Sequence, residues 1–329
     1  MRRRQLITSL VGSAATRPLA ARAQQPAGRV YRVGYFVVPS RERSLHLVKA
    51  FEEGLRSLGY RIGENVVIEY RFADGDMERL PALAASLVRL GVDVIVAGNN
   101  VNAFAVLKAT TTIPIVMANS ADPVSAGLVA SLARPGGTVT GLAQDTGGEQ
   151  HVKRLELLRS TLPNLSRAGI LWNPDFAPNR ERLTSLREVA PQLGLTLVPV
   201  EARGADALEQ AFATMARERV QMLAVLSDGV LFECRSQIGV LAFRDRLPTV
   251  AAAREYAEAG LLLTYGIELR DLFRRSAIFV DKILKGSKPA DLPIEQPTTF
   301  ELVVNFKTAR ALGIDIPPAL LARVDEAIE

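Results

Sequence analysis

Short apolar runs alternate with longer amphipathic stretches along most of this chain. Residues 33–37 form a continuous apolar run of strand length, and residues 93–97 are predicted to form another strand. Between them, residues 44–58 place apolar side chains at helical spacing and end at Gly59, a common helix stop. Strands that alternate with helices in this way predict parallel βαβ units with right-handed crossovers. The pattern therefore predicts an α/β protein built on parallel sheets.

The same order of elements returns about 130 residues further along the chain. The glycine that ends the first predicted helix, Gly59, has its counterpart 135 residues later in Gly194. The strand proline Pro114 has its counterpart 134 residues later in Pro248. A nearly constant offset between such landmarks predicts an internal duplication. We expect two similar Rossmann-like lobes.

The chain is expected to pass between these lobes three times. We place the crossings near residues 141–145, 265–268 and 297–300. Lobe one is then predicted to comprise 30–143 plus 266–297, and lobe two 144–265 plus 298–329. Several short hinge segments permit rigid closure without remodelling either core.

The net positive charge of the chain comes from its first 23 residues. The formal net charge is +5, but residues 1–23 contain five arginines and no acidic residue. The remaining residues carry 35 basic and 35 acidic side chains, so they offer no basic surface for nucleic acid. Beyond the first twenty-odd residues no apolar run approaches the ~18 residues that a membrane span needs.

Residues 1–23 predict a cleaved export signal. Arginines at positions 2–4 precede a mostly apolar stretch, and Ala21-Arg22-Ala23 forms a small-residue cleavage pattern. Consecutive arginines followed by Gln-Leu-Ile resemble a twin-arginine signal, with a general secretory signal or a basic amphipathic helix as alternatives. We expect cleavage after Ala23 and a periplasmic protein.

Small polar residues follow the predicted strands of both halves. In open parallel sheets, ligands bind at the carboxyl ends of the strands, and two facing lobes form a cleft there. Such ends suit hydrogen-bonded capture of a small polar molecule. The candidate residues at these ends are Ser40, Asn99, Asn100, Asn119, Asp122, Asn173, Ser227, Asp228 and Tyr265.

Each candidate also has a purely structural interpretation. Asn99 and Asn100 begin a predicted helix, where they would act as caps or seat a carboxylate at the helix N-terminus. Asp228 lies before a glycine and would either form a turn or pair with a ligand ammonium. Tyr265 would pack in a core or stack on a ligand, beside the space left by three alanines at 251–253.

The sequence offers little material for catalysis or for a metal site. His46 and His151 are far apart on predicted helices, and Cys234 has no neighbouring histidine. The chain contains no G-x-S-x-G, G-x-x-x-x-G-K-[ST] or G-x-G-x-x-G motif after its first strand. We therefore expect a protein that binds rather than catalyses, without metal or cofactor.

Ten stretches of the chain resemble a known family. The most specific is GLVASLARPGGTVTG at residues 127–141. The other stretches are 54–60, 67–73, 79–84, 92–96, 122–124, 171–174, 273–275, 281–286 and 290–293. Together they are similar to the periplasmic substrate-binding proteins of ABC importers, in the group that includes tryptophan- and tyrosine-binding members.

That resemblance implies a type I periplasmic-binding fold with three hinge crossings and a ligand held between the lobes. It further implies a monomer that delivers its ligand to a membrane permease served by a separate ATPase, and it implies that the nine strand-end candidates line the pocket. The ligand would be an amino acid or related acid, with a bulky or aromatic side chain given room by the alanines at 251–253. Two alternatives stay open: a sensory protein that presents its closed form to a membrane receptor, and a hydrolase that uses Asp122 or Asp228 as a general base.

Overall fold

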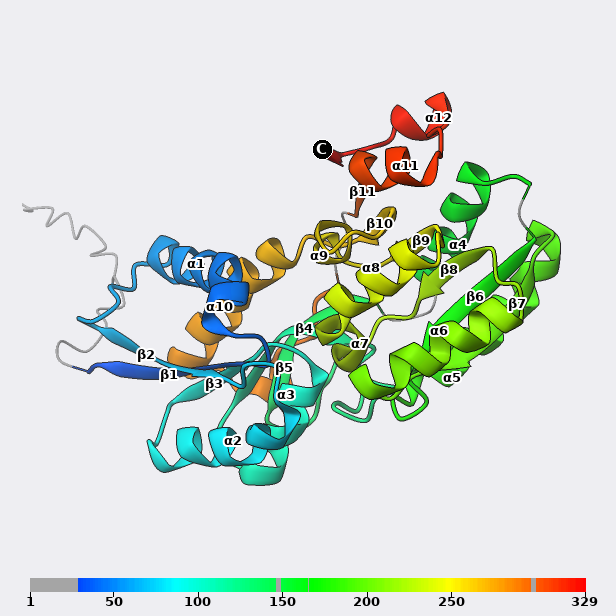
Figure 1. Cartoon of the computed structure of the whole chain (residues 1–329). Coiled ribbons are helices and arrows are strands. Elements are labelled where there is room, and N and C mark those ends of the chain that lie inside the picture. The colour runs from blue at the N-terminus through cyan, green and yellow to red at the C-terminus, as the bar shows by residue number, and fades with distance from the viewer. Residues whose placement is uncertain (1–28, 146–148, 165, 297–299) are drawn as a thin grey trace, which may run out of the picture.

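Two α/β lobes lie side by side in the computed structural model of the chain (Figure 1). The structure describes residues 29–145, 149–164, 166–296 and 300–329. The predicted export signal at 1–23 lies outside these residues. Within them, no helix combines the length and the apolar content that crossing a bilayer requires.

The first lobe contains a five-stranded parallel sheet in the order β2-β1-β3-β4-β5. Its strands are β1 (Tyr31–Val37), β2 (Val66–Phe72), β3 (Val94–Ala97), β4 (Ile115–Ala121) and β5 (Val139–Asp145). The helices α1 (Arg41–Ser57) and α10 (Leu269–Leu284) pack on one face, and α2 (Leu80–Arg89) and α3 (Asn100–Ala109) on the other. Alternate residues of β1 enter the two cores, because successive side chains of a strand point to opposite faces.

The second lobe contains a seven-stranded sheet in the order β12-β11-β10-β9-β8-β6-β7. Its strands are β6 (Arg167–Trp172), β7 (Thr196–Glu201), β8 (Met222–Val225), β9 (Thr249–Ala251), β10 (Leu263–Gly266), β11 (Glu301–Asn305) and β12 (Glu326–Ile328). Its helices are α4 (Glu149–Thr161), α5 (Pro178–Val189), α6 (Leu208–Arg217), α7 (Gly229–Glu233), α8 (Arg235–Arg244), α9 (Arg254–Glu258), α11 (Phe306–Leu312) and α12 (Pro318–Leu321). The helices α4 and α5 pack on one face of the sheet, and α6 and α8 pack on the other.

Strand order repeats between the lobes, in agreement with the predicted duplication. The sequence of pairings β2-β1-β3-β4 in the first sheet matches β7-β6-β8-β9 in the second. The second sheet departs from the all-parallel prediction at one place, where β10 and β11 run antiparallel. This happens because the chain reaches β11 by returning from the first lobe rather than through a crossover helix.

The chain passes between the lobes three times. It leaves β5 of the first sheet for α4, which packs on the second lobe, and it leaves β10 for α10, which packs on the first. A bridge between Leu142 and Glu295 then keeps the chain at the first sheet before it enters β11 of the second. Most of the predicted third crossing, residues 297–299, lies outside the described residues.

The return of α10 to the first lobe depends on close contact with α1, although more than two hundred residues separate the two helices (Figure 1). A Cβ atom on Gly54 of α1 would lie 2.3 Å from the carbonyl oxygen of Arg274 and 2.9 Å from the Cβ of Ala277. A buried hydrogen bond nearby joins the hydroxyl of Tyr60 to Asp281 Oδ1 at 3.0 Å. Glycine at position 54 therefore lets the two helix backbones touch.

We expect Gly54→Ala to destabilise the first lobe. The added methyl group would push α10 away from α1, and overpacking of this kind costs ~1–3 kcal/mol, part of which the better helix propensity of alanine offsets. Urea unfolding should show a lower midpoint for this variant. Gly137→Ala is the matched control, because Gly137 is exposed and a Cβ there would meet no atom within 4 Å. Equal midpoints for the two variants would contradict the close-packing argument.

Candidate ligand-binding site

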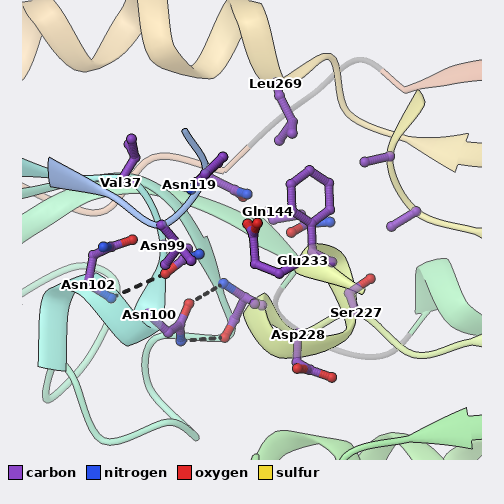
Figure 2. Close-up of a pocket in the computed structure, with 18 of the residues that line it drawn as sticks. Val37, Asn99, Asn100, Asn102, Asn119, Gln144, Ser227, Asp228, Glu233 and Leu269 are labelled. Atoms are coloured by element: carbon purple, nitrogen blue, oxygen red, sulfur yellow. Dashed lines mark hydrogen bonds between the residues drawn. The ribbon is translucent and has the colours of Figure 1, made fainter. Parts of the chain in front are cut away.

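A pocket that is partly open to solvent lies between the carboxyl ends of the two sheets (Figure 2). The first lobe contributes residues at the ends of β1, β3, β4 and β5, together with side chains of α1, α3 and α10. The second lobe contributes the ends of β8 and β9 and the helices α7 and α9. Five of the nine predicted site residues line this pocket: Asn99, Asn100, Asn119, Ser227 and Asp228.

The predicted asparagine pair begins α3, and both side chains make local hydrogen bonds. Asn99 is the N-cap, and its Oδ1 accepts a hydrogen bond from the backbone N–H of Asn102 at 3.2 Å. Asn100 donates through Nδ2 to the carbonyl of Ala121 at 3.0 Å, and its Oδ1 accepts from Ala121 N and Ser120 Oγ. Asn100 therefore ties the start of α3 to the end of β4, and this bonding holds that wall of the pocket.

Asp228 occupies the equivalent position in the second lobe as the N-cap of α7. Its Oδ1 accepts hydrogen bonds from the backbone N–H groups of Val230 at 2.8 Å and Leu231 at 3.0 Å. Asn173 Nδ2 donates to the same oxygen at 3.5 Å. Burial raises the pKa of Asp228 to about 6, against the lowering effects of these donors and of Arg182. In Figure 2 the carboxylate of Asp228 points away from the labelled amides of the first lobe.

Several buried polar atoms around this pocket have no hydrogen-bond partner in the part of the chain that the structure describes. They belong to six lining residues and total seven atoms: Asn102 Oδ1 and Nδ2, Asn119 Oδ1, Ser227 Oγ, Asp228 Oδ2, Glu233 Oε1 and Tyr256 Oη. A buried polar group without a partner costs ~1–3 kcal/mol, so native proteins keep such groups few. Their concentration around one pocket indicates a site shaped for a polar molecule.

An apolar wall stands beside these polar groups. Phe232 and Tyr256 meet edge to face with their ring centroids 5.7 Å apart, and Phe273 of α10 approaches from the first lobe. Ala252 and Ala253 line the pocket next to this wall, whereas Ala251 is buried in the core. Small residues beside aromatic rings leave room for a large flat or branched apolar group.

The charged side chains among the described lining residues are both acidic, Asp228 and Glu233. Burial raises the pKa of Glu233, while Arg235 and Arg43 act in the opposite direction. The site thus combines carboxylates, amides and aromatic rings, and it suits a ligand that carries a cationic nitrogen and an apolar group. Within the described ranges, no group of three or more His, Cys, Asp or Glu side chains is placed to hold a metal ion.

The structure places the other four predicted site residues away from the pocket lining. Ser40 caps α1 and accepts from Arg43 N at 3.4 Å, while Asp122 accepts from Ser125 N at 3.1 Å. Asn173 contacts Asp228 and is not among the residues that line the pocket.

Tyr265 lies against the second-lobe core, and its ring stacks on Phe300 with the centroids 5.8 Å apart. Its carbonyl accepts from Arg154 Nε at 2.6 Å, which holds β10 against α4. The side chain of Tyr265 therefore faces the core that contains α4 and α5, on the far side of the sheet from α7 and α9. The aromatic rings that line the pocket are instead those of Phe232, Tyr256 and Phe273.

Sequence reasoning missed four lining residues with polar groups, Asn102, Gln144, Glu233 and Tyr256. Asn102 follows Asn99 and Asn100 closely, so three amides within four residues at a helix start were a usable signal. Gln144 lies within the predicted crossing at 141–145, at the end of β5. Glu233 offered no signal, because it ends a short helix five residues after Asp228 and only the packing of α7 turns it toward the first lobe.

The lobes also touch each other directly around the pocket. A Cβ atom on Gly229 of α7 would lie 2.8 Å from Val101 Cγ2 and 3.0 Å from Asn99 Nδ2, both in α3 or at its cap. His46 Nε2 of α1 lies 3.3 Å from Glu255 Oε1 of α9. One buried apolar cluster continues from the first lobe into the second. The two lobes are therefore close together in this structure.

The raised pKa of Asp228 predicts a pH-dependent stability for the ligand-free protein. Its native pKa of about 6 exceeds the ordinary 3.8, so between these values the native state holds a proton that the unfolded state has lost. The free energy of unfolding should therefore fall as pH rises through this window, by about 3 kcal/mol at most.

Asp228→Asn keeps the capping oxygen and removes the charge. Urea unfolding should find the variant more stable than the wild type at pH 7.5 and equal to it near pH 4. A stability difference that is the same at both pH values would contradict a buried, charged Asp228.

The chain is similar in sequence and in fold to several known proteins. A curated tyrosine-binding protein from Clostridioides difficile (strain R20291) is 27% identical over 266 residues, which cover 81% of this chain and 76% of the relative. A solved ABC domain in complex with L-Trp from Streptococcus pneumoniae is 26% identical, with a TM-score of 0.83 over 91% of this chain and 100% of that one. A ligand-free, open substrate-binding protein with adhesive properties from Clostridium difficile is 25% identical, with a TM-score of 0.67 over 91% and 99% of the two chains.

The relatives share the two-lobed architecture of type I periplasmic binding proteins. A family profile described as ABC transporter substrate binding protein matches residues 33–328, nearly all of the part that the structure describes. Proteins of this family are extracytoplasmic solute-binding proteins. The chain belongs to the ABC transporter substrate-binding protein family.

Proposed function

We propose that this protein is the periplasmic solute-binding component of an ABC importer, and that it captures an amino acid with a large apolar side chain between its lobes. The carrying observation is the set of seven buried, unpartnered polar atoms that surround one pocket beside an aromatic wall. Capture rather than catalysis is the proposed role, so the protein is not an enzyme and needs no cofactor. Its partners would be a membrane permease and a separate ATPase, with the protein itself a monomer.

The chemistry of the pocket supports an amino acid as the ligand. The amides of Asn99 and Asn119 can donate to a carboxylate near the N-terminus of α3, where the helix dipole favours an anion. A carboxylate of the second lobe can receive the ammonium group, and the rings of Phe232, Tyr256 and Phe273 can surround the side chain. The relatives named for L-Trp and tyrosine support an aromatic side chain at that position.

Closure around the ligand is the proposed mechanism. Lobe one, 30–143 plus 266–297, would rotate as a rigid body against lobe two, 144–265 plus 298–329. The overall arrangement here is nearer to the relative with bound L-Trp than to the ligand-free, open relative, as their TM-scores of 0.83 and 0.67 indicate. The direct contact of Gly229 with α3 supports the same interpretation, since it brings the lobes together beside the pocket.

Ligand binding should compact the wild-type protein. A panel of the twenty common amino acids, tested by calorimetry, should yield at least one ligand, with L-tryptophan and L-tyrosine the first candidates. That ligand should raise the melting temperature by mass action and lower the radius of gyration in small-angle scattering. A tight ligand that leaves the radius of gyration unchanged would contradict closure.

Gly229→Val provides the matched test of closure. Its side chain would meet Val101 and Asn99, so it should hold the lobes apart and weaken binding by roughly tenfold or more, given ~1–3 kcal/mol of overpacking in the closed form. Gly204→Val is the control, because a Cβ at Gly204 would meet no atom within 4 Å. Equal affinities for the two variants would argue against a closed complex of this geometry.

Export by the twin-arginine route makes a separate prediction. Replacing Arg3 and Arg4 by lysine keeps the charge but removes the arginine pair that the twin-arginine export system recognises. The precursor should therefore accumulate in the cytoplasm. Cell fractionation measures this, and N-terminal sequencing of the wild-type mature protein should begin at Gln24. Normal periplasmic amounts of the double variant would point to the general secretory route instead.

A further inference from the structure

We infer that Glu233, rather than Asp228, is the carboxylate that receives the ammonium group of the ligand. This inference rests on the proposed function, since it names the residue that selects an amino acid over its deaminated analogue. The strand-end pattern assigned the role to Asp228, and the structure distinguishes the two carboxylates by the contacts that each already makes.

Asp228 already uses one carboxylate oxygen, Oδ1, as a helix cap, although its Oδ2 is buried without a partner among the described residues. One of its oxygens accepts two backbone hydrogen bonds from the first turn of α7 and a longer one from Asn173. The guanidinium of Arg182 is an additional favourable charge, and Arg182 is itself only 3% exposed. An ammonium placed against Asp228 would meet the repulsion of this buried cation with little water to screen it. In Figure 2 the carboxylate also points away from the first lobe, so it would not bridge the two.

Glu233 is in a different situation. The side chain accepts no hydrogen bond from any of the residues that the structure describes, and its Oε1 is buried without a partner. Of its two cationic neighbours, one already interacts with another residue and the other is screened by solvent. Arg235 donates to the carbonyl of Phe232 at 2.8 Å and lies over the Phe232 ring at 4.4 Å, and Arg43 is exposed to solvent. Glu233 as a residue is half-buried, but a carboxylate oxygen that is itself buried without a hydrogen bond is costly, and a hydrogen-bonded cation offsets that cost.

The place of Glu233 in the pocket suits an ammonium that bridges the lobes. The residue ends α7 in the second lobe, and Figure 2 shows it beside Gln144, with Asn119 on the first-lobe side. The Oδ1 of Asn119 is also buried and has no partner among the described residues. An ammonium group has three N–H donors, so Glu233 Oε1 and Asn119 Oδ1 can each accept one. Such a contact would form only when both lobes meet the same group.

A matched pair of ligands and a matched pair of variants test this inference. L-Tryptophan and 3-indolepropionic acid differ only in the amino group, and calorimetry gives the affinity of each for the wild type, Glu233→Gln and Asp228→Asn. Glu233→Gln should bind the amino acid at least about 30-fold more weakly, because the ammonium is left in a buried site without its counter-charge. Its affinity for the deaminated acid should hold or improve. Asp228→Asn should change both affinities by the same factor.

The outcomes separate the inference from the proposed function. If Asp228→Asn loses the amino acid selectively while Glu233→Gln does not, or if neither variant discriminates the two ligands, the inference is overturned. If the wild type binds none of the twenty amino acids, the proposed function fails and the inference fails with it. Thermal unfolding of the ligand-free variants checks their fold. Glu233→Asp, which keeps the charge at shorter reach, should retain part of the preference for L-tryptophan, and its retention of none would also count against a charge contact at this position.

Discussion

The carboxyl ends of the strands in the two lobes carry polar groups that face each other. These groups lose their contact with water when the lobes meet, and the site depends on how each group regains a hydrogen bond. Asn99 and Asn100 do so locally, because one caps a helix and the other ties a helix to a strand end, and Asp228 does so with its Oδ1 alone. These residues form the walls of the pocket. Others, including Asn102 and Glu233, have buried atoms with no protein partner among the described residues, and they define the polar surface that a ligand must match.

In the proposed mechanism, this division of roles would couple ligand binding to closure. With the lobes together and no ligand, each unpartnered buried atom costs ~1–3 kcal/mol, so water readmitted by opening relieves the cost. A ligand that supplies the missing partners reverses the balance and stabilises the closed form. In this mechanism the same ligand hydrogen bonds give the affinity and stabilise the closed form. A ligand without a group for each polar atom would therefore close the lobes less completely.

Close backbone packing at a few glycine positions supports the arrangement of the lobes and of the pocket. Gly54 lets α1 touch α10 and so holds the returning helix on the first lobe. Gly229 lets α7 touch α3 across the pocket. At Gly266, where the chain leaves the second sheet, a Cβ would lie 1.9 Å from the carbonyl oxygen of Ala252, so the hinge strand and the pocket edge are packed backbone to backbone. In the proposed closure, tightly packed lobes would move as rigid bodies, and the hinge segments would take up the change.

The sequence by itself determined the strands, the helices and the duplication, because apolar periodicity is local and each half repeats it in the same order. It also indicated the strand ends as the site, since parallel topology brings those ends to one edge, and five of the nine residues predicted there line the pocket. Only the tertiary structure decided which side chains face the cleft. Tyr265 turned to the other core and Glu233 turned inward, because the face that a strand or a short helix presents is decided by what packs against it from the rest of the chain.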